Sequence, residues 1–388
     1  MTCPDPDRYT LAGPDEVEQR IAHDQRRVCD EVAMLLPAAR ISALVLAGGY
    51  GCGEGGYRHD GLSVLPYNDY DYFLCVNGMT AAARRDLNVA LHRVAERLGR
   101  EFGIEVDFAV LRSERLARLP ACLMYSELKS RHRVLLGDPR ALEAIQSPLP
   151  ADLPLAEFSR MMLNRGALLL MNARELEEGA AVRARSCELF LRYFSKSLLA
   201  AGDARLAAAG QYHPSLSERS RRLREIDWIG SGREQFLDLY EHATRIRFGG
   251  DSGRVLKPGE PLRLQRLAVH EWLGAYRVLE TARLGAAPES WQAYAAPSVS
   301  KGQGSRRWWS AAHHVALAFM ARTGRRGTLD ASRLLRHPRE RLMAALPLLL
   351  EPGAPGPNRL AADALGASGD ASWRGLADFF LADWRRYC

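Results

Sequence analysis

The chain has no hydrophobic run long enough to cross a membrane. Even the apolar stretch from Leu342 to Leu350, which contains Pro347, is far shorter than the roughly 20 residues that a membrane-spanning helix needs. The first five residues, MTCPD, show neither a basic nor an apolar segment, so we see no secretion signal. We therefore expect no membrane association and a cytoplasmic location.

Cysteines are few and scattered. The chain contains seven of them, an odd number, and no two form a CxxC pair. This pattern favours reduced thiols in a cytoplasm over a disulfide framework or a zinc site.

The composition is that of an ordinary globular protein with a basic balance. The length of 388 residues suggests two or three domains. Apolar residues make up 47% and charged residues 26%, as in other globular proteins. The formal net charge of +7 reflects either solvated arginine faces or attraction to anionic partners such as nucleotides or RNA. The arginine-rich segment from Lys301 to Arg341 contains Trp308 and Trp309. These two side chains could stack on bases, or they could lie on a helix and pack in the protein core.

The first part of the chain alternates helical and strand-like patterns, as in an α/β domain. We predict helices over 14–37 and 80–98, and strands over 41–47, 69–76 and 104–110. Residues 48–68 contain seven glycines and Pro66 and have no helical period, so we expect a loop there. Along the third strand, Glu105 and Asp107 share the face opposite the apolar residues.

The rest of the chain is mainly helical by the same criterion. We predict helices over 155–176, 182–201, 262–284, 308–320, 331–350 (broken at Pro338 and Pro347) and 373–387. Proline-rich linkers are expected near 147–154 and 351–358. We therefore divide the chain into a domain over 1–150 and a helical region over 151–388, and place any further division near 230–260.

A glycine-rich turn followed by two carboxylates is the most informative pattern. Residues 48–54 read GGYGCGE after an apolar strand, and the next strand opens with Asp69-Tyr70-Asp71. Asp69 and Asp71 project from one face, because side-chain direction alternates along a strand. With Asp107 on a later strand, these elements resemble the nucleotidyltransferase superfamily of the DNA polymerase β type, and within it the glycine-turn variant of PII uridylyltransferase-like enzymes. The resemblance spans roughly residues 41–111.

The chain departs from that variant in two places. Cys52 stands where the variant has arginine, and nineteen residues separate Gly49 from Asp69, which is longer than usual for the family. We place the excess in residues 55–65, where it could form a lid or a substrate loop.

The resemblance implies a nucleotidyltransferase domain with a mixed sheet, followed by an α-helical domain. It also implies a Mg²⁺-dependent transfer of NMP from an NTP to an acceptor hydroxyl, with release of pyrophosphate. Asp69 and Asp71 would hold one ion on the triphosphate, and Asp71 and Asp107 would hold a second at the acceptor, whose proton Asp107 could take. The backbone N–H groups of Gly48 and Gly49 would cradle the β- and γ-phosphates.

Ordinary structural roles are the alternative for these carboxylates. Asp69 and Asp71 could be solvated residues at the start of a strand, and Asp107 could be a surface position on an amphipathic strand.

A second resemblance lies in the helix over 192–203. In polymerase β-like enzymes with a helical second domain, a helix lysine often reaches the triphosphate, and Lys196 interrupts an otherwise apolar face here. The alternative is a surface lysine whose stem lies on apolar side chains. Tyr212 and His213 follow this helix and could shape the acceptor side.

Other nucleotide-binding motifs fit less well. Gly51, Gly53 and Gly56 match GxGxxG, but a dinucleotide fold needs a helix to begin there, and residues 57–66 show no helical period. The sequence also contains no GK[ST] motif of a P-loop and no protein-kinase elements. A catalytically inactive module that binds a nucleotide or RNA remains an alternative. ATP is the default nucleotide, and the acceptor is left open among a small molecule, a protein and an RNA 3′ end.

Overall fold

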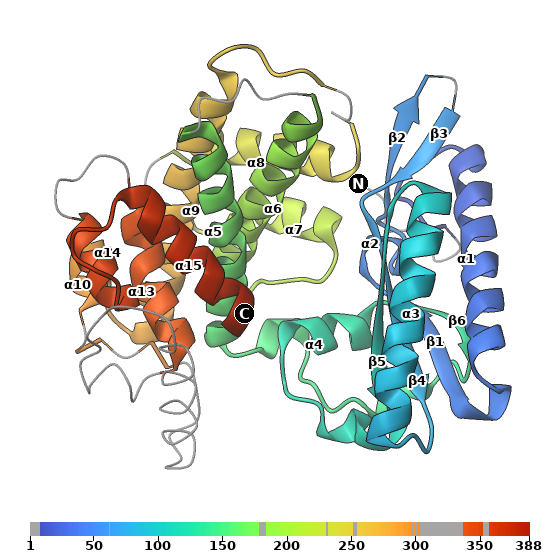
Figure 1. Ribbon diagram of the computed structural model, residues 1–388. Helices are drawn as coiled ribbons and strands as arrows, with labels where there is room; N and C mark the ends of the chain where they lie inside the picture. The colour runs from blue at the N-terminus through green and yellow to red at the C-terminus, as the bar shows by residue number, and fades with distance from the viewer. Residues whose placement is uncertain are drawn as a thin grey trace. The chain divides into compact units, whose positions relative to one another are not determined.

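The computed structural model describes residues 8–61, 63–177, 184–229, 232–250, 254–296, 298–299, 301–302, 337–351 and 357–388. They form a mixed α/β structure that is mostly helical and divides into two compact units (Figure 1). Unit 1 comprises Met1–Leu153, Gly210–Ile226 and Thr244–Ser252, and unit 2 comprises Pro154–Ala209, Asp227–Ala243 and Gly253–Cys388. None of the described helices is long and apolar enough to span a membrane.

Unit 1 is built on a mixed four-stranded sheet with the strand order β5-β4-β1-β6. Strand β1 is antiparallel to both of its neighbours, whereas β4 and β5 are parallel. The strands are β1 (Ile41–Leu46), β4 (Asp69–Val76), β5 (Glu105–Arg112) and β6 (Arg133–Gly137). The three strands predicted from the sequence are therefore confirmed.

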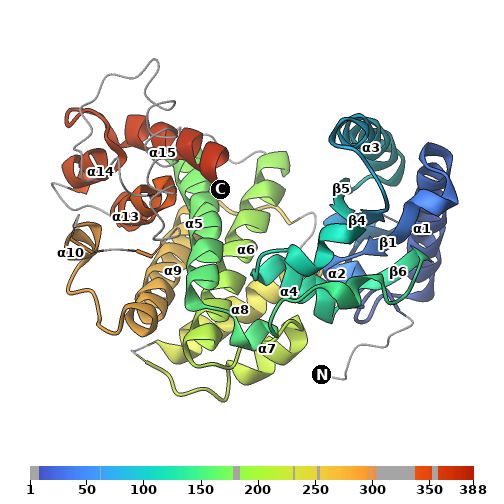
Figure 2. The ribbon, with the colours of Figure 1, turned by 90° about the horizontal axis from the view of Figure 1, so that it is seen from below.

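Two long helices cover one face of this sheet, as Figures 1 and 2 both show. Apolar residues of α1 (Asp15–Leu35) and α3 (Ala81–Phe102) pack on Tyr70, Tyr72 and other alternate strand residues. The Thr80 side chain caps α3, and Gly103 ends it with a positive φ of 75°, as expected for a left-handed helix terminus. Both predicted helices are confirmed.

The opposite face of the sheet is apolar over only part of its length. Phe73, Cys75 and Leu111 pack there on residues such as Leu128, whereas the starts of β4 and β5 carry carboxylates on this face. Unit 1 also contains the short helices η1 (Ala38–Arg40), η2 (Ser113–Arg118), α4 (Leu123–Ser130), η3 (Ala141–Ala144) and η4 (Pro150–Asp152).

The prediction of a loop over 48–68 was wrong. This segment contains a short helix, α2 (Gly48–Gly51), and a hairpin of β2 (Gly56–Asp60) and β3 (Ser63–Tyr67) that forms its own two-stranded sheet. The hairpin reverses at Gly61, which has a φ of +60°. Because Asp60 pairs with Ser63, Gly61 is the first of two connecting residues, where glycine is a known hairpin signal. The high glycine content of the segment concealed it.

Two later segments of the chain belong to unit 1. One contains α7 (Leu216–Arg222), and the other begins at Thr244, within the last turn of α8 (Arg233–Arg247). The Phe248 carbonyl accepts a hydrogen bond of 3.1 Å from the Tyr57 amide at the start of the hairpin. The domain that we predicted over residues 1–150 does not include these two segments.

The described part of unit 2 contains helices and no strand. Beside most of α8, they are α5 (Leu155–Glu177), α6 (Ala184–Ala208), α9 (Glu260–Leu284), α10 (Trp291–Ala295), α13 (Pro338–Leu350), α14 (Pro357–Leu365) and α15 (Trp373–Tyr387). Four predicted helices match α5, α6, α9 and α15, whereas the predicted helix over 308–320 and the surrounding arginine-rich run lie largely outside the described residues.

Proline has different effects at the two ends of α13. Pro338 is its first residue, where the missing N–H costs nothing. Pro347 lies inside the helix and does not break it, contrary to our expectation. All residues from Leu342 to Leu350 are buried, and we attribute the continuous helix to this packing, which outweighs the loss of one hydrogen bond near the helix end.

Candidate functional site

Four carboxylates lie on one face of the parallel pair β4 and β5. In this register Asp69 is opposite Glu105, and Asp71 is opposite Asp107. Adjacent strands lie about 4.8 Å apart, and paired residues project to the same side, so the acidic side chains form two neighbouring pairs. Asp69 and Asp71 are partly exposed, and Asp107 is exposed. Asp107 is thus on the strand that neighbours the one carrying Asp69 and Asp71, and it faces away from the helix-covered core.

The glycine turn packs directly against Asp71. Gly48 has a φ of +61°, and a Cβ atom built on it would lie 2.6 Å from the Asp71 Oδ2 atom. The Ala47 amide donates a hydrogen bond of 2.8 Å to the Asp71 carbonyl. Only glycine combines this backbone conformation with so close an approach, so Gly48 places the turn against the second carboxylate of the motif.

The rest of the turn is equally tight. A Cβ atom on Gly49 would lie 2.8 Å from Arg247 Nη2 and 3.0 Å from the Glu54 carbonyl, and one on Gly51 would lie 2.2 Å from the Leu46 carbonyl. The Glu54 amide donates a hydrogen bond of 2.7 Å to the Gly49 carbonyl. The two ends of the turn therefore lie close together, and the missing side chains of the glycines make this close approach possible.

Tyr50 ties the turn to the hairpin. Its buried hydroxyl lies 2.6 Å from the Gly56 carbonyl and 2.8 Å from the Tyr67 carbonyl, and it accepts a hydrogen bond of 2.8 Å from the Tyr67 amide. Burial raises the pKa of Tyr50 well above its ordinary value, so the hydroxyl stays protonated and can donate. The segment that we expected to be a lid or a substrate loop is anchored to the turn at its base.

Asn68 immediately precedes the first carboxylate and was missed by the sequence analysis. Its φ of 91° is the only positive value at a non-glycine residue in the described part of the chain. Its Nδ2 atom donates a hydrogen bond of 2.8 Å to the Arg247 carbonyl. Asparagine tolerates the left-handed region better than most residues, and this bond holds Asn68 where β4 and Asp69 begin.

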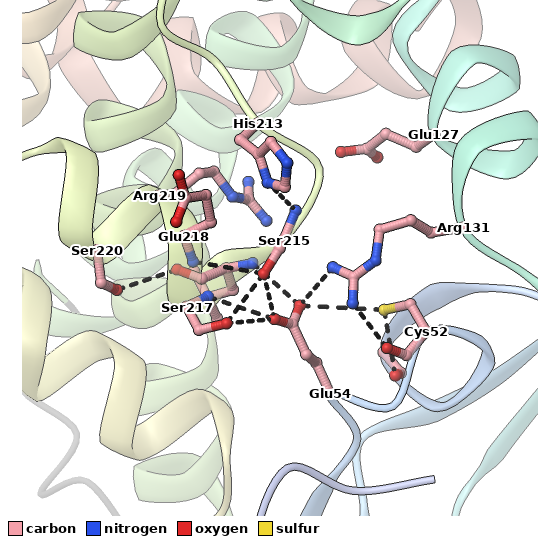
Figure 3. A network of polar contacts seen from close by, with 12 residues as sticks. Cys52, Glu54, Glu127, Arg131, His213, Ser215, Ser217, Glu218, Arg219 and Ser220 are labelled. Atoms are coloured by element: carbon pink, nitrogen blue, oxygen red, sulfur yellow. Dashed lines mark hydrogen bonds and ion pairs between the residues drawn. The ribbon is translucent and has the colours of Figure 1, made fainter. Parts of the chain in front are cut away.

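A buried carboxylate, Glu54, holds the end of the turn in place (Figure 3). Only 4% of it is exposed. It accepts hydrogen bonds from Arg131 Nη1 at 3.0 Å, Ser215 Oγ at 2.6 Å, the Leu216 amide at 3.0 Å and Ser217 Oγ at 2.8 Å. Burial acts to raise the pKa of Glu54, but the Arg131 charge and these hydrogen bonds outweigh it, and the pKa is lowered. Glu54 therefore stays ionised and joins the turn to the N-terminus of α7.

Cys52 does not have the character of a nucleophile. Burial is the main cause that raises the pKa of its thiol to about 11, so the thiol is protonated near neutral pH. Its carbonyl accepts a hydrogen bond of 2.7 Å from Arg131 Nη2. At the position where the resembled pattern has arginine, a guanidinium thus approaches from Arg131, which caps the end of α4.

Tyr212 and His213 lie in unit 1, on the segment that leads into α7. The Tyr212 hydroxyl donates to Glu127, and His213 Nδ1 accepts a hydrogen bond of 3.1 Å from the Ser215 amide. Burial and the charge of Arg222 are the leading causes that lower the pKa of His213, which favours the neutral imidazole at pH 7. Their role toward an acceptor stays a prediction.

Lys196 lies on α6 in unit 2, half-buried between the buried residues Ser195 and Ser197. The expectation that it reaches a triphosphate stays a prediction.

The donor chemistry of the acidic pairs suits Mg²⁺. Among the described residues, no three His, Cys, Asp or Glu side chains form a group that could hold a metal ion. Mg²⁺ is usually held by one or two carboxylates together with waters and substrate phosphates rather than by a complete protein cage. The pair Asp71 and Asp107, with Asp69 two residues away on the same face, provides such a partial set.

Comparison with known proteins adds no relative: no family model, curated protein or solved structure matches this chain. Functional inference therefore depends on the residues and the geometry of unit 1.

Proposed function

We propose that this protein is a Mg²⁺-dependent nucleotidyltransferase, which moves an NMP from an NTP, ATP by default, to an acceptor hydroxyl and releases pyrophosphate. The observation that carries the proposal is the register of Asp71 opposite Asp107 together with the packing of Gly48 on the Asp71 carboxylate. A carboxylate pair beside a glycine turn provides ligands for a cation at the place where backbone amides can meet phosphates.

Each residue has a defined task in this proposal. Asp69 and Asp71 would bind the Mg²⁺ of the triphosphate, and Asp71 and Asp107 would bind a second Mg²⁺ at the acceptor. When bound, the two ions would neutralise charge that develops during displacement at the α-phosphate. The exposed Asp107 can take the proton of the acceptor hydroxyl, while the amides of Gly48 and Gly49 bind the β- and γ-phosphates.

A nucleotidyltransferase-like module that binds a nucleotide or RNA without catalysis is the second candidate. It would use the same glycine turn to bind phosphate, with no catalytic role for Asp69, Asp71 and Asp107. The two candidates differ in one measurable respect, because a binding module forms no pyrophosphate.

Pyrophosphate release tests the proposal. The protein would be incubated with Mg²⁺, each of the four labelled NTPs, and acceptors of the three classes: small hydroxyl compounds, proteins and RNA with a free 3′ end. We expect one combination to yield pyrophosphate and a labelled acceptor. Asp71→Asn should abolish the reaction, whereas Asp86→Asn, at an exposed position of α3, should leave it unchanged. Absence of pyrophosphate with every combination would favour the binding module.

A further inference from the structure

Arg247 is held next to the glycine turn by its own main chain. Its carbonyl accepts the 2.8 Å hydrogen bond from Asn68, and a Cβ atom on Gly56 would lie 2.8 Å from that carbonyl. Two residues later, a Cβ atom on Gly249 would lie only 1.9 Å from the Tyr57 carbonyl. All of these residues belong to unit 1. The position of the Arg247 backbone is therefore fixed by contacts with the hairpin and with the start of β4.

The guanidinium of Arg247 lies next to the turn, and one of its nitrogen atoms has no hydrogen-bond acceptor among the described residues. Its Nη2 atom is the atom nearest to a Cβ built on Gly49, at 2.8 Å. Its Nη1 atom is buried and has no hydrogen-bond acceptor among the residues that the structure describes. A buried charged donor without an acceptor costs free energy, and a ligand oxygen would satisfy it.

Two consecutive residues of the turn thus lie next to side chains of opposite charge, a carboxylate and a guanidinium. Gly48 contacts Asp71 and Gly49 contacts the Arg247 guanidinium, and the Cα atoms of consecutive residues are only about 3.8 Å apart. Arg131, another arginine near this turn, already donates to Glu54 and to the Cys52 carbonyl. A magnesium polyphosphate needs both kinds of group at once: carboxylates for the cation and a guanidinium for the phosphate oxygens.

We propose that Arg247 binds the β- or γ-phosphate of the nucleotide, as a triphosphate-binding residue supplied by the last turn of α8. This inference rests on the proposed function, since it assigns a further ligand in the same site. The planar guanidinium can bind phosphate oxygens through two parallel hydrogen bonds. Arg247 would act beside the amides of Gly48 and Gly49, next to Gly49, while Asp71 lies next to Gly48.

Binding of inorganic tripolyphosphate tests this residue separately from catalysis. Titration calorimetry would compare the wild-type protein with Arg247→Ala, Arg247→Lys and the control Arg245→Ala, an exposed arginine on the same helix. We expect Arg247→Ala to weaken tripolyphosphate binding at least about tenfold. Arg247→Lys should retain part of the affinity, because it keeps the charge but not the paired hydrogen bonds, and Arg245→Ala should bind like the wild type.

The outcomes also separate this inference from the proposed function. If Arg247→Ala binds tripolyphosphate as tightly as the wild type, or if the wild type does not bind it, Arg247 is not a phosphate ligand, whatever the pyrophosphate assay gives. If binding depends on Arg247 but no NTP yields pyrophosphate, the anion site stands and nucleotidyl transfer fails. Should Arg247→Ala not fold, the comparison of Arg247→Lys with Arg245→Ala decides, and equal binding by these two would reject the role.

Discussion

At the scale of single residues, the site depends on side-chain contacts that the motif did not predict. The carboxylates of the motif are placed by Asn68 before them and by Glu54 at the end of the turn. Asn68 has no sequence signal of its own, and Glu54 ends the GGYGCGE pattern without any role being predicted for it. Their roles depend on partners about 160 to 180 positions away along the chain.

Glu54→Gln tests the buried ion pair. Removing one member of a buried pair leaves the other charge without compensation, so we expect a loss of about 3 kcal/mol in the free energy of unfolding, measured by urea denaturation at pH 7. The control Glu225→Gln alters an exposed ion pair with Arg221 and should have little effect. If the two variants are equally stable, Glu54 does not hold the turn in place.

The same pair predicts a pH dependence. The pKa of Glu54 in the folded protein is lowered below 4.5, so its contribution is present above the unfolded pKa and is lost as the pH falls through the folded value. The difference in unfolding free energy between the wild type and Glu54→Gln should therefore be constant from pH 7 to about pH 5. It should shrink as the pH falls below 4.5, and a difference that grows on acidification would contradict the assignment.

Two substitutions of Asn68 separate the effect of backbone strain on stability from the effect of its hydrogen bond. Asn68→Gly loses the bond to the Arg247 carbonyl but adopts the φ of 91° without strain. Asn68→Ala loses the bond and is also strained. We expect the alanine variant to be less stable than the glycine variant by about 1 kcal/mol, in thermal or urea unfolding. Equal stability of the two would show that this backbone conformation is not maintained.

At the scale of elements, the directions and register of the strands fix the positions of the turn and of the carboxylates relative to each other. A parallel register fixes which side chains face each other, so Asp71 can be opposite Asp107 only if α3 returns the chain by the connection seen here. The turn then approaches the same carboxylate because β1 is antiparallel to β4 and ends beside it.

Gly48→Ala should damage the site more than the stability of the fold. It introduces strain at a φ of +61° and a contact of 2.6 Å with Asp71. Gly103→Ala, with a φ of +75° and nothing within 4 Å of its Cβ, has the strain alone and is the matched control. We expect similar losses of about 1 kcal/mol in stability, but at least a tenfold fall in kcat/KM for Gly48→Ala only. Equal activities would mean that Asp71 does not need its present position.

At the scale of the whole chain, local patterns predicted most of the long helices and three strands of the main sheet, but not β6 or α8. They also did not predict which segments of the chain form unit 1. Helices α1 and α3 and strands β4 and β5 have clear periodicity, and Thr80 caps α3; both signals are encoded by neighbouring residues. The hairpin was missed because its glycines resembled those of a loop. The recruitment of 210–226 and 244–252 was missed because contacts such as Tyr57 with Phe248 join residues with no shared local pattern. Arg247 was missed for the same reason, whereas Lys196 attracted attention because it interrupts an apolar helix face.

A double-mutant cycle on Asp71 and Asp107 tests the central claim most directly. The kcat/KM for pyrophosphate release would be measured for the wild type, Asp71→Asn, Asp107→Asn and the double variant, once the active NTP is known. Residues that act as one catalytic unit are strongly non-additive, so we predict that each single variant loses at least about a thousandfold and that the double variant is hardly worse. Full activity of Asp107→Asn, or losses that multiply in the double variant, would contradict the account.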